Sequence, residues 1–236
     1  MKNNVILNTV PTMPLFLNTE NPAALLEHGN GLLKYPLVLV HGIVAHDRHL
    51  FVDFWGRIPF VLQSLGIKVF FGNTDAWGSS ESNAVILKNT IEKILGETKT
   101  EKVNIIAHSK GGIDSRYLIW RYNFGDKVAS LTTISTPHHG AEIADLIAGQ
   151  DIIYSNLAKH TMEIFGQLYG DTNPDLYAVL RQLTTGNMEM FNKKVAADER
   201  VYYQSIYTVM NKASDDILFS PTYSYIKKQA VIMTAL

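Results

Sequence analysis

The chain has 236 residues and a mass of 26.4 kDa, which is the size of one large domain. Its 21 Lys and Arg residues against 22 Asp and Glu residues give a net charge of −1, so it lacks the electrostatic field of a nucleic-acid-binding protein. Hydrophobic residues make up 46% and charged residues 18%, which excludes a disordered chain. The absence of Cys excludes disulfides, thiolate nucleophiles and Cys-ligated zinc.

The N-terminal 34 residues contain Asn, Pro and Gly at intervals, and they predict an irregular arm. Polar residues and prolines interrupt the apolar stretch at residues 1–17, so we expect no secretory signal and take the cytoplasm as the default location. No apolar run approaches the roughly 18 residues of a membrane span.

Five short apolar runs, rich in β-branched residues, predict strands at residues 37–40, 68–72, 103–106, 128–135 and 201–210. Helical spacing predicts helices at residues 53–65, 83–95 and 112–122. In the first helix the apolar positions that share one side are Phe54, Ile58, Val61, Leu62 and Leu65. Apolar strands that alternate with helices are typical of an α/β fold, in which a mostly parallel sheet has helices on both faces.

Residues 141–197 break this alternation, because the segment is too long for a crossover and contains several apolar patterns of helix length. We interpret it as a helical cap inserted into a single domain of residues 1–236. A shorter polar segment, residues 77–82, follows the second predicted strand and is expected to be a loop on the side of the active site.

The strongest motif is at residues 105–112, where a strand ends, Ser109 follows, and two glycines open a helix. Such a turn holds a Ser in strained backbone geometry with its hydroxyl exposed. The positions two before and two after it must be small because strand and helix pass close together, and Ala107 and Gly111 meet this requirement. His108 and Lys110 flank the Ser. The alternative interpretation is a Gly-rich turn with an idle Ser.

A second motif, His41-Gly42-Ile43, directly follows the first predicted strand. Acyl transfer to a serine needs backbone N–H donors aimed at the developing oxyanion. Lys110, the residue after the Ser, would provide one amide, and Ile43 the other, with Gly42 allowing the turn. Both motifs come at the carboxyl ends of buried strands, where open parallel sheets bind their ligands.

With these motifs on residues 35–42, 102–112 and 133–140, the chain resembles the bacterial triacylglycerol lipases of the α/β-hydrolase fold. The resemblance implies hydrolysis of lipid esters with Ser109 as nucleophile, the Ile43 and Lys110 amides as oxyanion hole, and no cofactor. It also implies that residues 141–197 form a lid that touches lipid interfaces transiently. Nine residues could form its apolar face, or could simply be core: Ile143, Leu146, Ile147, Ile152, Ile153, Leu157, Ile164, Phe165 and Leu168.

The general base has no residue at its expected place. In this fold the acid and then the His follow the Ser, yet no His lies beyond His160, whereas the last predicted strand starts near residue 201. His138, His139 and His160 are weak surrogates. Asp215 and Asp216 could mimic the acid but fit solvated loop residues better.

The C-terminal residues 229–236 suggest an explanation, since the family would continue there with an Asn-Asp-Gly-Leu loop that carries the acid. Read one nucleotide out of frame, the codons of Met233 and Thr234 always spell Asp, and the whole tail can spell Gly-Gly-Asn-Asn-Asp-Gly followed by Leu. We therefore hypothesise a frameshifted, truncated lipase that lacks its last strand and helix. Such a chain would leave its fifth strand as an unpaired edge of the sheet. We also expect it to bind no calcium and to have impaired activity.

The remaining signals are minor. His46 and His49 have a metal-ligand spacing but no third ligand, so we predict no metal site. Arg116 is expected to be a buried ion-pair partner, and of Lys110 only the amide is needed. Two other functions stay open, a thioesterase or acyltransferase, and a catalytically dead chain that binds lipid or a partner.

Overall fold

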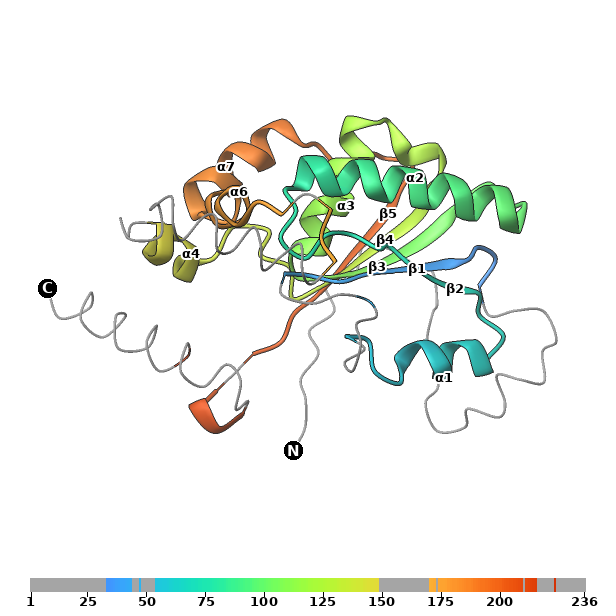
Figure 1. Cartoon of the computed structure of the whole chain (residues 1–236), viewed down its shortest axis with the longest axis horizontal. Helices are drawn as coiled ribbons and strands as arrows, with labels where there is room; N and C mark the ends of the chain where they lie inside the picture. The colour runs from blue at the N-terminus through green and yellow to red at the C-terminus, as the bar shows by residue number, and fades with distance from the viewer. Residues whose placement is uncertain are drawn as a thin grey trace, which may run out of the picture.

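A parallel five-stranded sheet organises the chain (Figure 1). The computed structural model describes residues 33–43, 47, 54–148, 170–172, 174–209, 211–215 and 223. The strands lie in the order β2-β1-β3-β4-β5, and every pair is parallel. Their bounds are Leu37–Val40 (β1), Val69–Phe71 (β2), Val103–His108 (β3), Val128–Ile134 (β4) and Tyr202–Ile206 (β5). All five predicted strands are confirmed, although the last is shorter than expected.

Helices cover both faces of the sheet, which confirms the predicted α/β class. Figure 1 shows α2 (Ser80–Thr98) and α3 (Lys110–Arg121) on one face and α1 (Ile58–Ser64) on the other. A short 3-10 turn, η2 (Phe124–Asp126), leads into β4, and another, η4 (Ala213–Asp215), follows β5. Among the described helices, none is both long and apolar enough to cross a membrane.

The first strand is buried on both faces, as its unbroken apolar sequence predicts. Val38 and Val40 point into a cluster with α2 and α3 that includes Leu87, Ile91 and Leu118. Leu37 and Leu39 point to the opposite side and pack with Trp55, Phe54 and Leu62. Because successive strand residues face opposite ways, a strand with no polar position must have protein on both sides.

The chain order places a topological switch point between β1 and β3. From β1 the chain crosses outward to β2 and then returns past β1 to β3, so the two crossovers leave in opposite directions. Ligands of open α/β sheets bind outside the carboxyl ends of the strands at such a point. The carboxyl ends that meet there are Val40 and His108, which lead directly into the two predicted motifs.

Two predicted helices differ from the structure. The helical spacing predicts that Ile58 and Val61 pack, but they are 52% and 45% exposed. The residues of this segment that pack on β1 include Leu62 of α1 and Phe54, which precedes the helix. The segment of residues 77–82 is not wholly a loop, since α2 starts at Ser80. Ser79 explains that start, because its side chain accepts a hydrogen bond from the Ser82 amide and caps the helix.

The described part of the predicted cap contains α4 (Glu142–Ala148), α6 (Leu176–Gln182) and α7 (Thr185–Lys194). They gather beyond the carboxyl ends of the strands (Figure 1). One apolar cluster joins them to α3 and to the residue after Gly42; its members include Ile43, Ile113, Ala144, Val179, Leu183 and Met188. Of the proposed apolar face, Ile143 and Ile147 are half-buried. The side chain of Leu146, and all of Ile152, Ile153, Leu157, Ile164, Phe165 and Leu168, lie outside the described residues.

Candidate active site

Ser109 lies between β3 and α3 in strained backbone geometry. Its φ is 52° and its ψ is −128°, a region that non-Gly residues avoid. Neighbouring elements hold the strain: the Ser109 amide donates to the Ile134 carbonyl over 2.8 Å, and the Ser109 carbonyl accepts from the Thr136 hydroxyl over 2.8 Å. Strain persists only where the surroundings over-determine the backbone. The sharp turn predicted from the sequence is therefore confirmed.

Gly42 brings the end of β1 against Ser109. A Cβ on Gly42 would lie 2.7 Å from Ser109 Cβ and 3.2 Å from Ser109 Oγ. The sequence predicts that this Gly allows a turn, but its φ is not positive, so the missing side chain leaves room for Ser109 instead. The Ile43 nitrogen is two covalent bonds from Gly42 Cα, which places that amide in the same corner as the Ser109 side chain.

Gly111 is small for a different reason from the one expected. A Cβ there would lie 2.3 Å from the His41 carbonyl oxygen and 2.9 Å from the Val40 carbonyl oxygen. The first turn of α3 therefore packs on the end of β1, not on the strand that precedes Ser109. Ala107 is fully buried in β3, where it pairs with Val40.

His41 ties the loop after β1 to the loop after β2. The ring is 1% exposed, with Nδ1 2.7 Å from the Gly42 carbonyl oxygen and Nε2 2.9 Å from the Thr74 carbonyl oxygen. These contacts fix the orientation of the Gly42–Ile43 peptide. His41 thus holds the segment that carries the Ile43 amide through contacts with two backbone carbonyls.

His108 packs against Phe54, with ring centroids 5.1 Å apart. Burial lowers the pKa of the His108 imidazole below its ordinary value, and the nearby His41 lowers it further by a smaller electrostatic effect. Its Nδ1 is buried without a hydrogen-bond partner. A neutral ring is the form that this environment favours.

His138 is held in a structural network. Arg116 donates to its Nδ1 over 3.1 Å, and its Nε2 lies 3.0 Å from the Thr133 hydroxyl. Because Arg116 can only donate, Nδ1 must carry no proton. Burial, followed by the charge of Arg116, lowers the pKa of His138 to about 4. Both ring nitrogens are engaged, so this His does not serve Ser109.

A pH titration of stability tests this assignment. The folded-state pKa of His138 lies below the ordinary 6.5, so between about pH 4 and 6.5 the unfolded chain binds more protons than the folded one. The free energy of unfolding should therefore rise with pH across this window. The stability that neutral His138 contributes is lost as the pH falls toward 4. Urea unfolding of His138→Gln should show a flatter slope than the wild type, and an unchanged slope would contradict the network.

Arg116 differs from its predicted role as an ion-pair partner. Its partners among the described residues are neutral: His138, the side-chain oxygen of Asn192 at 2.9 Å and the ring of Phe191 at 5.1 Å. These contacts join α3 to α7. A guanidinium can donate to amide oxygens and stack on aromatic rings as well as pair with carboxylates. The sequence alone does not show which of these partners lies beside Arg116.

The other candidate bases and ligands fall in three groups. His139 is exposed, and Asp215 accepts from the amides of Asn211 and Lys212 in its own turn. His28, His46, His49, His160 and Asp216 lie outside the described residues. Within the described ranges no His, Asp or Glu side chain bonds to Ser109, and no group of three or more such residues could hold a metal ion.

A buried polar layer beside the Ser109 turn is absent from the sequence predictions. Lys110 is 1% exposed, and its ammonium lies 2.7 and 2.8 Å from the two carboxylate oxygens of Asp114. The sequence signal for this ion pair was that Lys110 and Asp114 are four residues apart, a spacing at which the side chains of a helix are neighbours. A charged residue is usually placed at the surface by default, so the sequence points only to the Lys110 amide.

A second part of this layer is a reciprocal clamp between two segments far apart in the sequence. Asp171 accepts from the amides of Ala76 and Trp77 over 2.7 and 2.9 Å. Asp75 accepts from the amide and hydroxyl of Thr172 over 2.9 and 2.8 Å. The clamp fixes the segment that leads into α6 against the loop after β2.

The chain contains a matched pair for testing the clamp. Asp145 binds the amide and hydroxyl of Thr185 over 2.9 and 3.0 Å, as Asp75 binds Thr172, but at an exposed position. We expect Asp75→Ala to lower the free energy of unfolding by about 2 kcal/mol, because Asp75 is 4% exposed and its part-buried bonds to Thr172 lose a charged acceptor that water replaces poorly. Asp145→Ala should lower it by less than about 1 kcal/mol, because water replaces the carboxylate. Equal losses in denaturant unfolding would contradict a role for burial.

Comparison with known proteins places this geometry in a family. Residues 36–225 match the sequence model described as palmitoyl protein thioesterase. The triacylglycerol lipase of Burkholderia plantarii is 34% identical over 187 residues, which cover 73% of this chain and 51% of the relative. The triacylglycerol lipase of Pseudarthrobacter phenanthrenivorans is 35% identical over 174 residues, which cover 68% and 53%. The chain thus spans about half the length of these curated relatives.

Solved structures agree with the sequence relatives. The crystal structure of a Bacillus licheniformis lipase in its mature form superposes with a TM-score of 0.55 at 25% identity, covering 72% of this chain and 64% of that one. The predicted resemblance to triacylglycerol lipases is therefore confirmed, as is the α/β-hydrolase fold. The chain belongs to the palmitoyl protein thioesterase family of α/β-hydrolases and is a relative of the triacylglycerol lipases.

Proposed function

We propose that the chain hydrolyses carboxylic esters of lipids, with Ser109 as the nucleophile and the Ile43 and Lys110 amides as the oxyanion hole. One observation carries the proposal: a strained Ser at the switch point touches the Gly that precedes the second amide donor. Ser109 Oγ would attack the ester carbonyl, and the two amides would bind the developing oxyanion. The ester C–O bond would then break, and the alcohol would leave with the proton that Ser109 gives up. Water would then release the acid from the acyl-enzyme.

An apolar wall beside this corner supports a lipid acyl chain as substrate. Ile43, which bears one proposed amide, packs on the cluster of Ile113, Val179 and Met188. An acyl chain bound along this wall would leave water, and each buried methylene would contribute about 0.8 kcal/mol. The names of the curated relatives, triacylglycerol lipases, agree with such a substrate. Transient contact of the cap with a lipid interface belongs to the same proposal.

Turnover is expected to be slow, because within the described residues no His bonds to Ser109. In serine hydrolases that lose a triad member, the oxyanion hole and substrate binding still leave about a thousandfold acceleration over water. We therefore expect acylation of Ser109 at a measurable but slow rate, without a rapid first release of the alcohol product. A fast burst would instead reveal a general base supplied from outside the described ranges.

Covalent labelling tests the proposal directly. A hexadecyl fluorophosphonate should add one phosphonyl group to the folded chain, and peptide mapping should place it on Ser109 rather than on other serines such as Ser79, Ser80 or Ser115. The same chain unfolded in urea is the control and should stay unlabelled. Hydrolysis of p-nitrophenyl butyrate and palmitate then measures chain-length preference. A folded chain with no label on Ser109 would leave a lipid-binding chain as the better account.

Thioester hydrolysis is the second candidate, because the matching family is described as palmitoyl protein thioesterase. The same serine and oxyanion hole serve both reactions, since both pass through a tetrahedral oxyanion. The ratio of kcat/KM for palmitoyl-coenzyme A to that for p-nitrophenyl palmitate separates the candidates. We expect the oxygen ester to be preferred.

A further inference from the structure

Beside the proposed nucleophile lies a buried ion pair that the proposed chemistry does not use. Lys110 and Asp114 have side chains 1% and 2% exposed, and two hydrogen bonds of 2.7 and 2.8 Å join them. Withdrawing an ammonium and a carboxylate from water is unfavourable unless both are fully bonded. Hydrophobic residues of the same size often give equal stability, so stability alone does not explain the pair.

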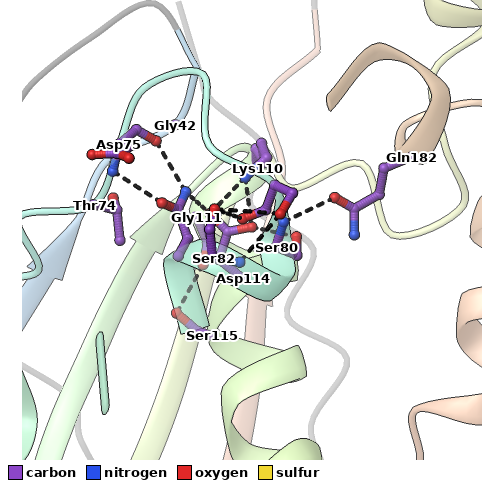
Figure 2. A network of polar contacts seen from close by, with 12 residues as sticks. Gly42, Thr74, Asp75, Ser80, Ser82, Lys110, Gly111, Asp114, Ser115 and Gln182 are labelled. Atoms are coloured by element: carbon purple, nitrogen blue, oxygen red, sulfur yellow. Dashed lines mark hydrogen bonds and ion pairs between the residues drawn. The ribbon is translucent and has the colours of Figure 1, made fainter. Parts of the chain in front are cut away.

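The pair is anchored to a second helix, which Figure 2 shows from close by. Asp114 also accepts hydrogen bonds from the Ser80 hydroxyl and, over 2.8 Å, from Asn83, both in the first turn of α2. The Ser80 amide in turn lies 3.3 Å from the Gln182 side-chain oxygen of α6. The carboxylate that binds the far end of the Lys110 side chain is therefore held in turn by α2, whose first turn also contacts Gln182 of α6.

The near end of the same side chain is the peptide that the proposed reaction needs. Lys110 is the first residue of α3, so its N–H has no acceptor within the helix. That peptide follows directly on the strained Ser109. The carbonyl side of this peptide is already held, because Ser109 O accepts from the Thr136 hydroxyl over 2.8 Å and from the Gly112 amide over 3.1 Å. On the N–H side, the Lys110 side chain is bonded at its far end to Asp114 and so restrains the Lys110 Cα that carries this N–H.

We propose that the Lys110 side chain, through Asp114, is a positioning group that aims the Lys110 N–H at the oxyanion. The inference rests on the proposed function, in which that N–H is one of two oxyanion donors. Removing a donor outright lowers turnover by about 10² to 10³ in serine hydrolases. A donor that is misaligned but present should lose about tenfold.

The alternative role, simple stabilisation of the fold, is separated by a neutral pair. In Lys110→Met with Asp114→Asn, both charges are gone, yet the Asn oxygen still accepts from α2. Because uncharged replacements of buried pairs often preserve stability, its melting temperature should stay within about 4 °C of the wild type. The matched control is Lys88→Met with Glu92→Gln, which removes a half-exposed pair of the same spacing on α2 together with the Lys127–Glu92 pair.

The test uses hexylboronic acid, whose boron bonds to the Ser109 oxygen while the Ser109 proton passes to water. The resulting anionic tetrahedral boronate places one of its hydroxyl oxygens in the proposed oxyanion hole. Calorimetric titration should show binding about tenfold weaker for the neutral pair than for the wild type and unchanged for the control pair. Hexanol, which has the chain but no oxyanion, should bind all three equally. If the neutral pair melts far below the wild type, the titrations are repeated at a temperature at which circular dichroism shows every variant folded, and the same weakening should appear.

Two outcomes would overturn the inference, and they are distinguishable. Wild-type binding of hexylboronic acid that exceeds that of Ser109→Ala, together with unchanged binding by the neutral pair, would overturn the positioning role and leave the proposed function standing. Wild-type binding no stronger than that of Ser109→Ala would overturn both.

Discussion

Replacing Ser109 by Ala should abolish fluorophosphonate labelling entirely, because the oxygen that forms the covalent bond is gone. Ser109→Gly should be equally unreactive, but the two variants should differ in stability. Ala keeps the strain of a side chain at φ 52° and ψ −128°, whereas Gly adopts this region freely. Strain of this kind costs about 1 to 3 kcal/mol, and the greater chain entropy of unfolded Gly offsets part of the relief.

Denaturant unfolding should therefore place Ser109→Gly above Ser109→Ala by about 1 kcal/mol. This order is the reverse of that expected in an ordinary helix or strand, where Ala is the more stable of the two. Mass spectrometry measures the labelling, and both variants must give a native circular dichroism spectrum. Ala more stable than Gly would show that the backbone at this position is relaxed, and label persisting on either variant would mean that another residue reacts.

The second large effect is expected from Gly111→Ala. The new Cβ would sit 2.3 Å from the His41 carbonyl oxygen and 3.0 Å from Val40 Cγ1. The first of these is a backbone atom at the end of β1, which is hydrogen-bonded to β2 on one side and β3 on the other and cannot move aside. Overpacking of this kind lowers the free energy of unfolding by about 3 kcal/mol, despite the better helix propensity of Ala.

Gly96→Ala is the matched control for this substitution. Gly96 also lies in a helix, but it is exposed, and nothing lies within 4 Å of the place that a Cβ would occupy. Its replacement should raise the free energy of unfolding by up to about 1 kcal/mol. For a chain of this size, calorimetry should find Gly111→Ala melting about 6 to 12 °C below the wild type. A melting temperature within about 2 °C of the wild type would contradict the close contact.

The elements of the fold were largely predictable from the sequence, because their signals are local. The apolar run at residues 37–40 admits only a strand covered on both faces, and the structure covers it on both. Surface helices are harder, since periodicity shows which residues share a side but not whether anything covers that side. Ile58 and Val61 have the right spacing and are nevertheless exposed.

The site was predictable where its residues are neighbours in the chain. The Ser109 turn and the His41-Gly42-Ile43 segment were each recognisable, and both were expected at the carboxyl ends of buried strands, where open parallel sheets bind their ligands. What the sequence could not show was the polar layer around them. The clamp joins Asp75 to Thr172, 97 residues away, and no local pattern encodes a partner at that distance. The buried Lys110–Asp114 pair is likewise completed by Ser80 and Asn83 of α2, which lie 34 and 31 residues from Asp114 in the chain.

The all-parallel sheet has a consequence for how fast the chain reaches its native state. Leu37 pairs with Asn104, so β1 and β3 can pair only after the chain has closed a long loop between them. No described strand pair closes through a tight hairpin, since each requires a crossover. Contacts between residues distant in sequence slow folding. Refolding should therefore be slow, and strand edges left unpaired during that time are open to association between chains.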